Sequence, residues 1–178
     1  MKNIIIMGGS NSATSINKQL AVYASEQLQS SNIQIIDLGD LNLPLFNVQL
    51  QTKNGIPQAV EDLVSLFNQA DGLIISTSEH NRTITAALKN MLDWCSRSKI
   101  DFLSNTPTLL MSTSPGGYGG KNARNTAEII LPMFKADIIS KFSLPNFPNN
   151  FSDGKITDTE LNDALKSAIT IFELAVYA

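Results

Sequence analysis

The sequence predicts an α/β fold of three layers, in which a doubly wound, five-stranded parallel sheet carries helices on both faces. Two observations predict this class. Short apolar runs alternate with longer amphipathic segments along the whole chain, and the first apolar run ends in Gly8-Gly9. Five strand–helix units in a row require right-handed crossover connections, which place helices on both faces of a parallel sheet.

Each predicted strand is a compact apolar run of the kind that a parallel sheet buries on both faces. The first run, Asn3–Met7, is cut short by two glycines and a serine, so it indicates a strand rather than a secretory signal. The strands are expected to pair in flavodoxin-like order. The other four are Ile33–Asp37, Leu73–Thr77, Thr108–Thr113 and Ile138–Phe142.

The segments between the strands repeat apolar residues at helical spacing. Pro57–Gln69, for example, places apolar side chains at i, i+3, i+4 and i+7. The last predicted helix opens with Thr157–Glu160, a capping-box pattern. The predicted helices span Ser15 to about Gln29, Pro57–Gln69, Thr83–Arg97, Asn122 to about Phe134, and about Asp158 to Val176.

Length and composition predict a single domain over residues 1–178. A chain of 178 residues with 43% hydrophobic residues can bury one sizeable core. Two more polar segments, Leu41–Ile56 and Pro145–Ile156, contain Pro, Asn and Gly at intervals. We expect both to be surface loops rather than linkers between domains.

Charge and cysteine content narrow the classes of partner. The net charge of -3 and the lack of a Lys/Arg run argue against nucleic acid. No apolar segment approaches the roughly 20 residues of a membrane span. The single cysteine, Cys95, cannot form an internal disulfide, which favours a reducing, cytoplasmic location. Because Cys95 falls on the apolar stripe of its helix, we expect it to pack in the core rather than act in redox chemistry.

Three polar or glycine-rich loops follow predicted strands. In an open α/β sheet, ligands bind beyond the carboxyl ends of the strands, near the switch in strand order. Gly8–Asn17 follows the first strand, Ser78–Arg82 the third and Ser112–Lys121 the fourth. The sequence therefore places a candidate ligand site where these loops meet.

The first loop is dense in hydroxyl groups and side-chain amides, and it leads into a predicted helix. A helix N-terminus offers unpaired N–H donors and a favourable dipole to a phosphate. The loop lacks both the P-loop lysine and the G-x-G-x-x-G spacing, so a terminal monophosphate held by neutral donors fits better than a nucleoside triphosphate. A polar turn with helix-capping Ser and Asn would explain the same residues.

The other two loops carry weaker signals. Ser114–Gly120 contains four glycines and Tyr118 in seven residues, which permits a flat ligand to approach the backbone closely. An ordinary flexible turn has the same composition. Ser78–Arg82 holds the only histidine, His80, at the end of a buried strand. A lone histidine is often structural, but its position among polar residues favours ligand contact.

Five segments match, in consistent order, motifs of one known family. Gly9–Asn17 corresponds to G-S-x-R-x-x-S-x-N after the first strand, and Leu43–Asn47 to the loop after the second. Ser78–Asn81 corresponds to P-E-Y-N, and Ala87–Trp94 to the fairly specific A-L-K-N-x-x-D-W. Ser114–Gly120 corresponds to the glycine-rich loop after the fourth strand. The chain thus resembles the NADPH-dependent FMN reductase family, flavodoxin-like proteins that include quinone, azo and chromate reductases.

This resemblance implies an FMN-binding oxidoreductase. It implies transfer of hydride from NADPH or NADH to bound FMN, and onward transfer to a quinone, azo, flavin or similar small acceptor, with no side chain assigned as a catalytic acid or base and no metal. By the same resemblance the first loop holds the FMN phosphate and the other two flank the ring. The implied cofactor-binding residues are Ser10, Ser12, Ser15, Ile16 and Asn17; Glu79, His80, Asn81 and Arg82; and Ser114, Pro115, Gly116, Gly117 and Tyr118.

The resemblance also implies an assembly. Family members commonly form dimers or tetramers with FMN near a subunit interface, so a homodimer or homotetramer is expected. Lys89, Asn90 and Asp93 lie on the polar side of their predicted helix, where they would either serve such an interface or solvate the helix. The sequence leaves open whether Trp94 lies at a subunit contact or under the edge of the sheet.

Two departures from the family pattern concern the ligand site. Ser12 stands where the family usually has Arg, which removes a cationic contact to phosphate or NADPH. Ser78 and His80 replace the usual Pro and Tyr, which changes the surface over the flavin, and Arg82 is a candidate to supply the lost charge. His80 is a candidate to protonate a quinone or azo product, because an unperturbed imidazole titrates near neutral pH.

Two other functions agree with the same residues. One is an FMN electron carrier without productive access for a nicotinamide, and the other is a flavin-free interaction domain. A phosphoacceptor receiver domain is excluded, because it needs acidic residues after the first strand and an Asp after the third. The chain has Met7-Gly8-Gly9 and Thr77-Ser78 at those places.

Overall fold

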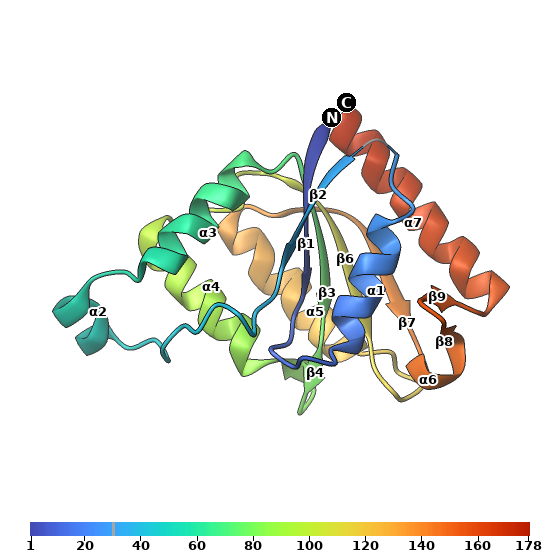
Figure 1. Ribbon diagram of the computed structural model, residues 1–178, viewed down its shortest axis with the longest axis horizontal. Helices are drawn as coiled ribbons and strands as arrows, with labels where there is room; N and C mark the ends of the chain where they lie inside the picture. The colour runs from blue at the N-terminus through green and yellow to red at the C-terminus, as the bar shows by residue number, and fades with distance from the viewer. Residues whose placement is uncertain (30) are drawn as a thin grey trace.

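Five parallel strands form the central sheet of the computed structural model, which describes residues 1–29 and 31–178 (Figure 1). The strand order is β2-β1-β3-β6-β7, and every neighbouring pair is parallel. This is the expected flavodoxin-like order, so the predicted fold class is confirmed. The strands are β1 (Lys2–Gly8), β2 (Ser31–Ile36), β3 (Gly72–Thr77), β6 (Pro107–Thr113) and β7 (Asp137–Leu144).

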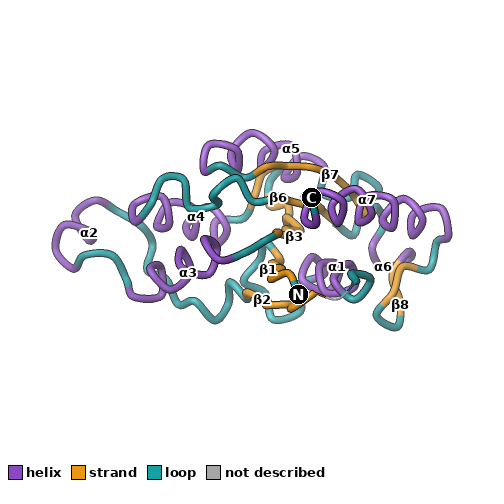
Figure 2. Tube along the Cα trace, turned by 90° about the horizontal axis from the view of Figure 1, so that it is seen from above, coloured by secondary structure: helices purple, strands orange, loops and turns teal. Residues whose placement is uncertain are grey.

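Helices cover both faces of this sheet. Seen from above, α1 and α5 lie on opposite sides of the strands (Figure 2). Helices α1 and α7 pack on one face, and α3, α4 and α5 on the other. None of the helices within residues 1–29 and 31–178 is long and apolar enough to cross a membrane. The helices that cover the sheet are α1 (Ile16–Ser25), α3 (Gln58–Gln69), α4 (Ala86–Ser98), α5 (Lys121–Ile130) and α7 (Thr159–Tyr177).

Two apolar cores hold the layers together, one on each face of the sheet. Side chains alternate along β1: Ile4 and Ile6 enter the core beneath α1 and α7, whereas Ile5 and Met7 enter the core beneath α3, α4 and α5. All four are at most 4% exposed. Burying a side chain of this size stabilises the fold by about 1.5–3 kcal/mol. The apolar runs therefore form strands because both of their faces are covered.

The two predicted surface loops contain regular structure, which corrects that prediction. Helix α2 (Val48–Asn54) lies within Leu41–Ile56, extends away from the body in Figure 1 and buries none of its residues. Asn47 caps it by accepting a hydrogen bond of 2.7 Å from the N–H of Leu50. With no buried face, this helix has no apolar periodicity to reveal it. Pro145–Ile156 holds α6 (Phe147–Asn150) and the hairpin of β8 (Phe151–Ser152) and β9 (Lys155–Ile156).

The predicted helix from Thr83 begins three residues later. Glu79–His80 (β4) and Thr83–Ile84 (β5) form a small antiparallel hairpin, so Ile84 belongs to a strand. Helix α4 starts at Ala86 because the Thr85 hydroxyl accepts the N–H of Leu88 at 3.1 Å and caps the helix. The ligand loop is thus a hairpin rather than the first turn of a helix.

Three other helix boundaries also differ from prediction. Helix α5 ends at Ile130 and continues as a 3-10 turn, η1 (Leu131–Phe134), because Pro132 has no N–H to extend the α-helical pattern. Helix α1 ends at Ser25 instead of Gln29, and the chain tightens into i to i−3 hydrogen bonds. In α7 the cap is Asp158 rather than Thr157, since its carboxylate accepts the N–H of Leu161 at 2.9 Å.

Candidate functional site

The three predicted ligand loops meet beyond the carboxyl ends of β1, β3 and β6, at the lower edge of the sheet in Figure 1. Together they enclose a cavity of about 210 Å³. The remaining predicted residues, Asn81, Arg82, Gly116, Gly117 and Tyr118, are exposed on the same loops outside its walls. Predicted residues that line the cavity are Ser10, Ser12, Ser15, Ile16, Asn17, Glu79, His80, Ser114 and Pro115.

The N-terminus of α1 opens into this cavity with unused donors. Ser15 caps the helix, its hydroxyl accepting the N–H of Lys18 at 3.2 Å. Within the described residues, no protein group accepts a hydrogen bond from the amide of Ile16 or Asn17. The first turn of a helix lacks the carbonyls that would satisfy such amides. This cradle, residues 10–17, therefore presents two backbone donors together with several hydroxyls.

Gly8 allows the helix to start this close to the strand. A Cβ at Gly8 would lie 2.6 Å from the backbone nitrogen of Lys18, so any larger residue would push α1 away. Gly9, which follows Gly8, is held by Thr85, whose hydroxyl donates to the Gly9 carbonyl at 2.7 Å. The cap of α4 thereby holds the cradle, a role of Thr85 that the sequence did not indicate.

Asn17 uses its side chain to join α1 to two strands, β3 and β6, rather than to face a ligand. Its carbonyl oxygen accepts the Ser76 hydroxyl at 2.7 Å and the Thr113 N–H at 2.9 Å, and its amide donates to the Thr113 carbonyl at 3.0 Å. Asn17 is only 1% exposed. What it offers the cavity is its backbone N–H.

No cation lines the cradle among the residues described. The nearby Lys18 forms an ion pair with Asp37. The Lys18 ammonium and the N–H of Gly39 hold the pKa of the Asp37 carboxyl below its usual value of 3.8. Arg82, the candidate to replace the arginine missing at Ser12, is exposed in the turn of the β4–β5 hairpin. The cradle is therefore neutral.

Glu79 lies at the cavity but is engaged by α5. Its carboxylate accepts the N–H of Asn122 at 3.0 Å, the N–H of Ala123 at 3.3 Å and the Asn122 side-chain amide at 3.1 Å. Gly120 at the start of α5 has no side chain to cap the helix, so Glu79 takes that place. The second ligand loop is thereby fastened to the end of the third.

The β4–β5 hairpin turns through two residues in left-handed conformation, Asn81 at φ 51° and Arg82 at φ 65°. Positive φ at both central positions is typical of a type I′ turn, which asparagine tolerates well. His80, just before the turn, is exposed and lines cavities on both sides.

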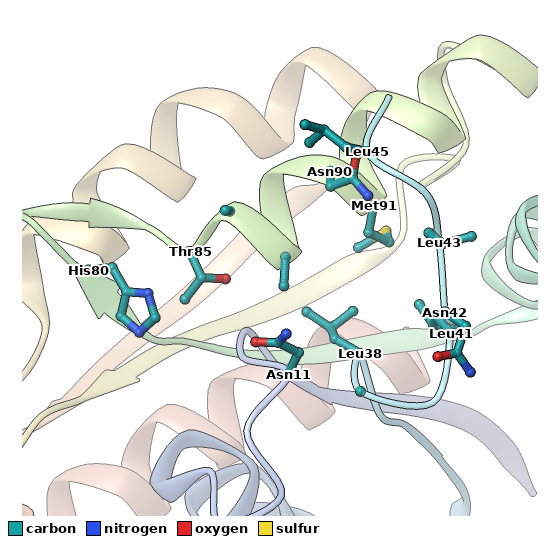
Figure 3. A pocket seen from close by; sticks show the side chains of 13 residues that line it. Asn11, Leu38, Leu41, Asn42, Leu43, Leu45, His80, Thr85, Asn90 and Met91 are labelled. Atoms are coloured by element: carbon teal, nitrogen blue, oxygen red, sulfur yellow. The ribbon is translucent and has the colours of Figure 1, made fainter. Parts of the chain in front are cut away.

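The larger of these two cavities was not indicated by the sequence. It measures about 420 Å³ and lies between the segment after β2 and the start of α4 (Figure 3). Its walls are mixed: Leu38, Leu43 and Met91 are among the apolar residues, and the polar residues are Asn11, Asn42, His80, Thr85 and Asn90. No Lys, Arg, Asp or Glu lines it among the described residues.

Two residues of α4 hold the outer wall of this larger cavity. The Asn90 side chain accepts the N–H of Phe46 at 2.8 Å and donates to the Pro44 carbonyl at 3.1 Å. Trp94, 1% exposed, packs edge to face against Phe46 at 5.1 Å between ring centroids. Trp94 is thus buried beneath this segment. Lys89 and Asp93 form an ion pair at 2.6 Å along the helix.

Comparison with known proteins agrees with this geometry. The profile of the NADPH-dependent FMN reductase family matches residues 1–149. A quinone reductase of Escherichia coli K12 is 30% identical over 138 residues, covering 74% of this chain and 72% of the relative. An NADPH azoreductase of Bacillus sp. OY1-2 is also 30% identical over 138 residues, covering 78% and 73%.

The solved structure of FerB, a flavoenzyme NAD(P)H:(acceptor) oxidoreductase from Paracoccus denitrificans, superposes with a TM-score of 0.73 at 22% identity. The match covers 98% of this chain and 99% of FerB, and it supports the fold. The profile match carries the further conclusion. The chain belongs to the NADPH-dependent FMN reductase family, with the oxidoreductase activity and the FMN and NAD(P)H cofactors that its sequence predicts.

Proposed function

We propose that residues 1–178 act as one FMN-binding domain that holds the FMN phosphate in the cradle of residues 10–17. The observation that carries this proposal is the pair of unpartnered amides, Ile16 and Asn17, at the start of α1. A helix N-terminus with free N–H groups is a ready site for a phosphate. The hydroxyls of Ser10 and Ser12 line the same cavity and add donors.

The residues present fit a monophosphate better than a larger phosphate chain. The cavity at the cradle is small, about 210 Å³, and none of the described residues that line it is a lysine or an arginine. A triphosphate or diphosphate carries more charge than neutral donors balance. A single terminal phosphate at the positive end of α1 needs no such cation.

The rest of FMN would extend between the second and third loops. The amides of Gly116, Gly117 and Tyr118 have no acceptor within the described part of the chain and are exposed to a ligand. Backbone N–H groups next to a flavin stabilise the negative charge of its reduced form. Tyr118, 61% exposed, is available to cover a ring face. Asn81 and Arg82 lie in the turn of the hairpin that forms the second loop.

When bound, FMN supplies the hydride and electron transfer, and the chain supplies binding and orientation. No side chain at the site is needed as an acid or base for that transfer. His80 stands between the two cavities, where its imidazole is placed to donate a proton to an acceptor. An acceptor turnover that His80→Phe leaves unchanged would contradict this role.

We infer that the acceptor is a small, uncharged, planar conjugated molecule such as a quinone or an azo compound. The larger cavity, about 420 Å³ with walls of mixed polarity, has the size for such a molecule, and Leu38, Leu43 and Met91 offer it an apolar contact surface. The relatives named quinone reductase and NADPH azoreductase support the same class.

We also propose a homodimer or homotetramer. Leu45 and Val48, at the base of α2, are 77% and 60% exposed, and α2 buries none of its residues. A second copy would cover this apolar surface. Light scattering coupled to size exclusion tests it, and a monomer at all concentrations would contradict it. The buried single cysteine accords with a reducing, cytoplasmic environment.

The first experiment is the visible absorption spectrum of the purified chain with FMN, recorded before and after anaerobic addition of NADPH and then NADH. A bound flavin that bleaches with either nucleotide supports the reductase. A bound flavin that does not bleach would favour an electron carrier, and a chain that fails to bind FMN would favour an interaction domain.

A second experiment tests the cradle itself. Ile16→Pro deletes one free N–H, and proline is tolerated at this first helical position. Ser15, at φ −56° and ψ 113°, already lies outside the α region that a following proline disfavours. The matched control, Ile16→Ala, trims the same side chain but keeps the N–H. We expect only the proline variant to weaken FMN binding, by about tenfold; equal affinities would place the phosphate elsewhere.

A further inference from the structure

Three polar side chains form a chain of hydrogen bonds beneath the glycine-rich loop. An Nη1 nitrogen of Arg124, on α5, lies 3.0 Å from the hydroxyl of Ser143 on β7. That hydroxyl lies 2.7 Å from the hydroxyl of Ser112, its register partner on β6. The Ser112 hydroxyl lies 2.7 Å from the carbonyl oxygen of Gly119.

The chemistry of these groups allows only one direction of donation. A guanidinium donates and never accepts, so Ser143 accepts from Arg124. The Gly119 carbonyl can only accept, so it takes the single proton of Ser112. The contact between the two hydroxyls must then use the proton of Ser143. Every donor therefore points from the cation toward the glycine-rich loop.

Burial makes this ordered chain strong. Ser112 is fully buried, and Arg124 is partly buried with its Nε atom enclosed by protein and without a partner. Within the described residues, no carboxylate lies within 4 Å of the Arg124 guanidinium. The charge is therefore directed into the hydrogen-bond chain rather than offset by an anion, and successive bonds polarise one another.

The last acceptor, Gly119, is a point where the loop has little freedom. Its φ is 60°, and a Cβ there would lie 3.1 Å from the backbone of Leu144. The loop has a second tie, from the N–H of Asn146 to the carbonyl of Gly116 at 3.0 Å. Between these two ties lie the exposed residues Gly117 and Tyr118.

We propose that Arg124 is a positioning residue for the glycine-rich loop, acting through Ser143 and Ser112 on the Gly119 carbonyl. The charge of Arg124 orders the two hydroxyls and holds the exposed segment of the loop in the conformation that receives the ligand. This inference rests on the proposed FMN site, because that segment flanks the flavin there. Arg124 itself does not touch the ligand.

Hydrogen–deuterium exchange of the flavin-free chain tests the inference without FMN. Arg124→Met keeps the side-chain length but removes charge and donors. We expect it to speed exchange of the amides of Gly119 and Lys121 by about tenfold. Arg124→Lys keeps a charge and a donor and should restore most of the protection. Lys155→Met, which removes an exposed cation on β9 that forms no ion pair among the described residues, is the control and should match the original chain.

Ser143→Ala interrupts the same row of hydrogen bonds at a different residue, and it can be used if Arg124→Met proves too unstable to study. The double variant should exchange no faster than the faster single variant, because both changes interrupt one chain. Unchanged loop exchange in Arg124→Met or Ser143→Ala would overturn the inference, and so would additive effects.

FMN binding separates this inference from the proposed function. Faster loop exchange with about tenfold weaker FMN binding supports both. Faster loop exchange with unchanged FMN affinity supports the positioning role of Arg124. It contradicts the proposal that the glycine-rich loop contributes to FMN binding. A chain that does not bind FMN at all overturns the proposed function, whereas the exchange data still decide the role of Arg124.

Discussion

The indole Nε1 of Trp94 donates a hydrogen bond of 2.7 Å to the carbonyl oxygen of Pro44. Fifty residues separate the two in sequence, and the bond joins α4 to the segment that forms the outer wall of the larger cavity. Trp94 is the only tryptophan of the chain. Its fluorescence therefore reports the position of that wall and of any ligand that moves it.

Loss of the Asn90 side chain should release this wall. Asn90→Ala leaves the N–H of Phe46 and the carbonyl of Pro44 without one partner each. We expect a loss of about 1–3 kcal/mol in the free energy of unfolding and a red shift of Trp94 emission as water reaches the indole. Urea titration and emission spectra measure both. Asn125→Ala, at an exposed position on α5, is the control.

Ser12→Arg should strengthen FMN binding, because the cradle has no cation. Ser12 is exposed, so an arginine has room to reach a phosphate, and a charge-assisted bond would raise affinity by about tenfold at low salt. The gain should shrink as salt is added. Fluorescence titration of FMN measures the affinity. Ser12→Gln, of similar length but neutral, should gain little, and equal gains in both variants would exclude a charge effect.

Asn17→Ala should destabilise the fold more than it weakens ligand binding. The substitution removes three buried hydrogen bonds that link α1 to β3 and β6. We expect a loss of about 2–4 kcal/mol in unfolding free energy, because the Ser76 and Thr113 groups stay buried without partners. Chemical denaturation measures it. A stable variant that binds FMN poorly would instead assign the side chain to the ligand.

Acid should weaken the fold partly through Asp37. Its pKa is lower in the folded chain than its ordinary value of 3.8, so its stabilising contribution is present above that value. The contribution is lost as the pH falls through the lower folded pKa. Asp37→Asn should therefore show a shallower loss of stability below about pH 4 in urea titrations. Asp40→Asn, an exposed neighbour, should follow the original chain.

Cys95 should not react with thiol reagents while the chain is folded. It is fully buried beside the sulfur of Met91 at 3.6 Å, and burial raises the pKa of its thiol to about 12. Only the thiolate is reactive. Labelling by a disulfide reagent should occur at the rate of unfolding, whereas Cys introduced at exposed Ser167 should react at once. Fast labelling of Cys95 would contradict a core role.

The strands and the meeting of the three loops could be predicted because both follow from local pattern. A strand buried on both faces, such as β3, is a continuous apolar run, and parallel strands end at one edge. Helix α2 could not be predicted, because it buries no face and so has no periodicity. The β4–β5 hairpin was hidden because Thr83–Ile84 continues the apolar spacing of α4.

Contacts between distant residues were the part of the site that the sequence did not indicate. The sequence places Asn17 in the phosphate loop, yet its side chain is engaged by Ser76 and Thr113. The bond from Arg124 to Ser143 depends on the register of β6 and β7 and on which face of α5 packs against the sheet. Neither can be inferred from the local sequence. The larger cavity was missed for the same reason.

The engagement of Glu79 by α5 has a consequence for the orientation of any anionic ligand. Helices α1 and α5 both start at this edge of the sheet, on opposite sides of the strands (Figure 2). The positive end of α5 is already neutralised by the Glu79 carboxylate, whereas that of α1 still has free amides. A molecule with one anionic end and one flat end can therefore bind in one orientation only, with its anionic end at α1. In the reversed orientation its anionic end would meet the Glu79 carboxylate at α5.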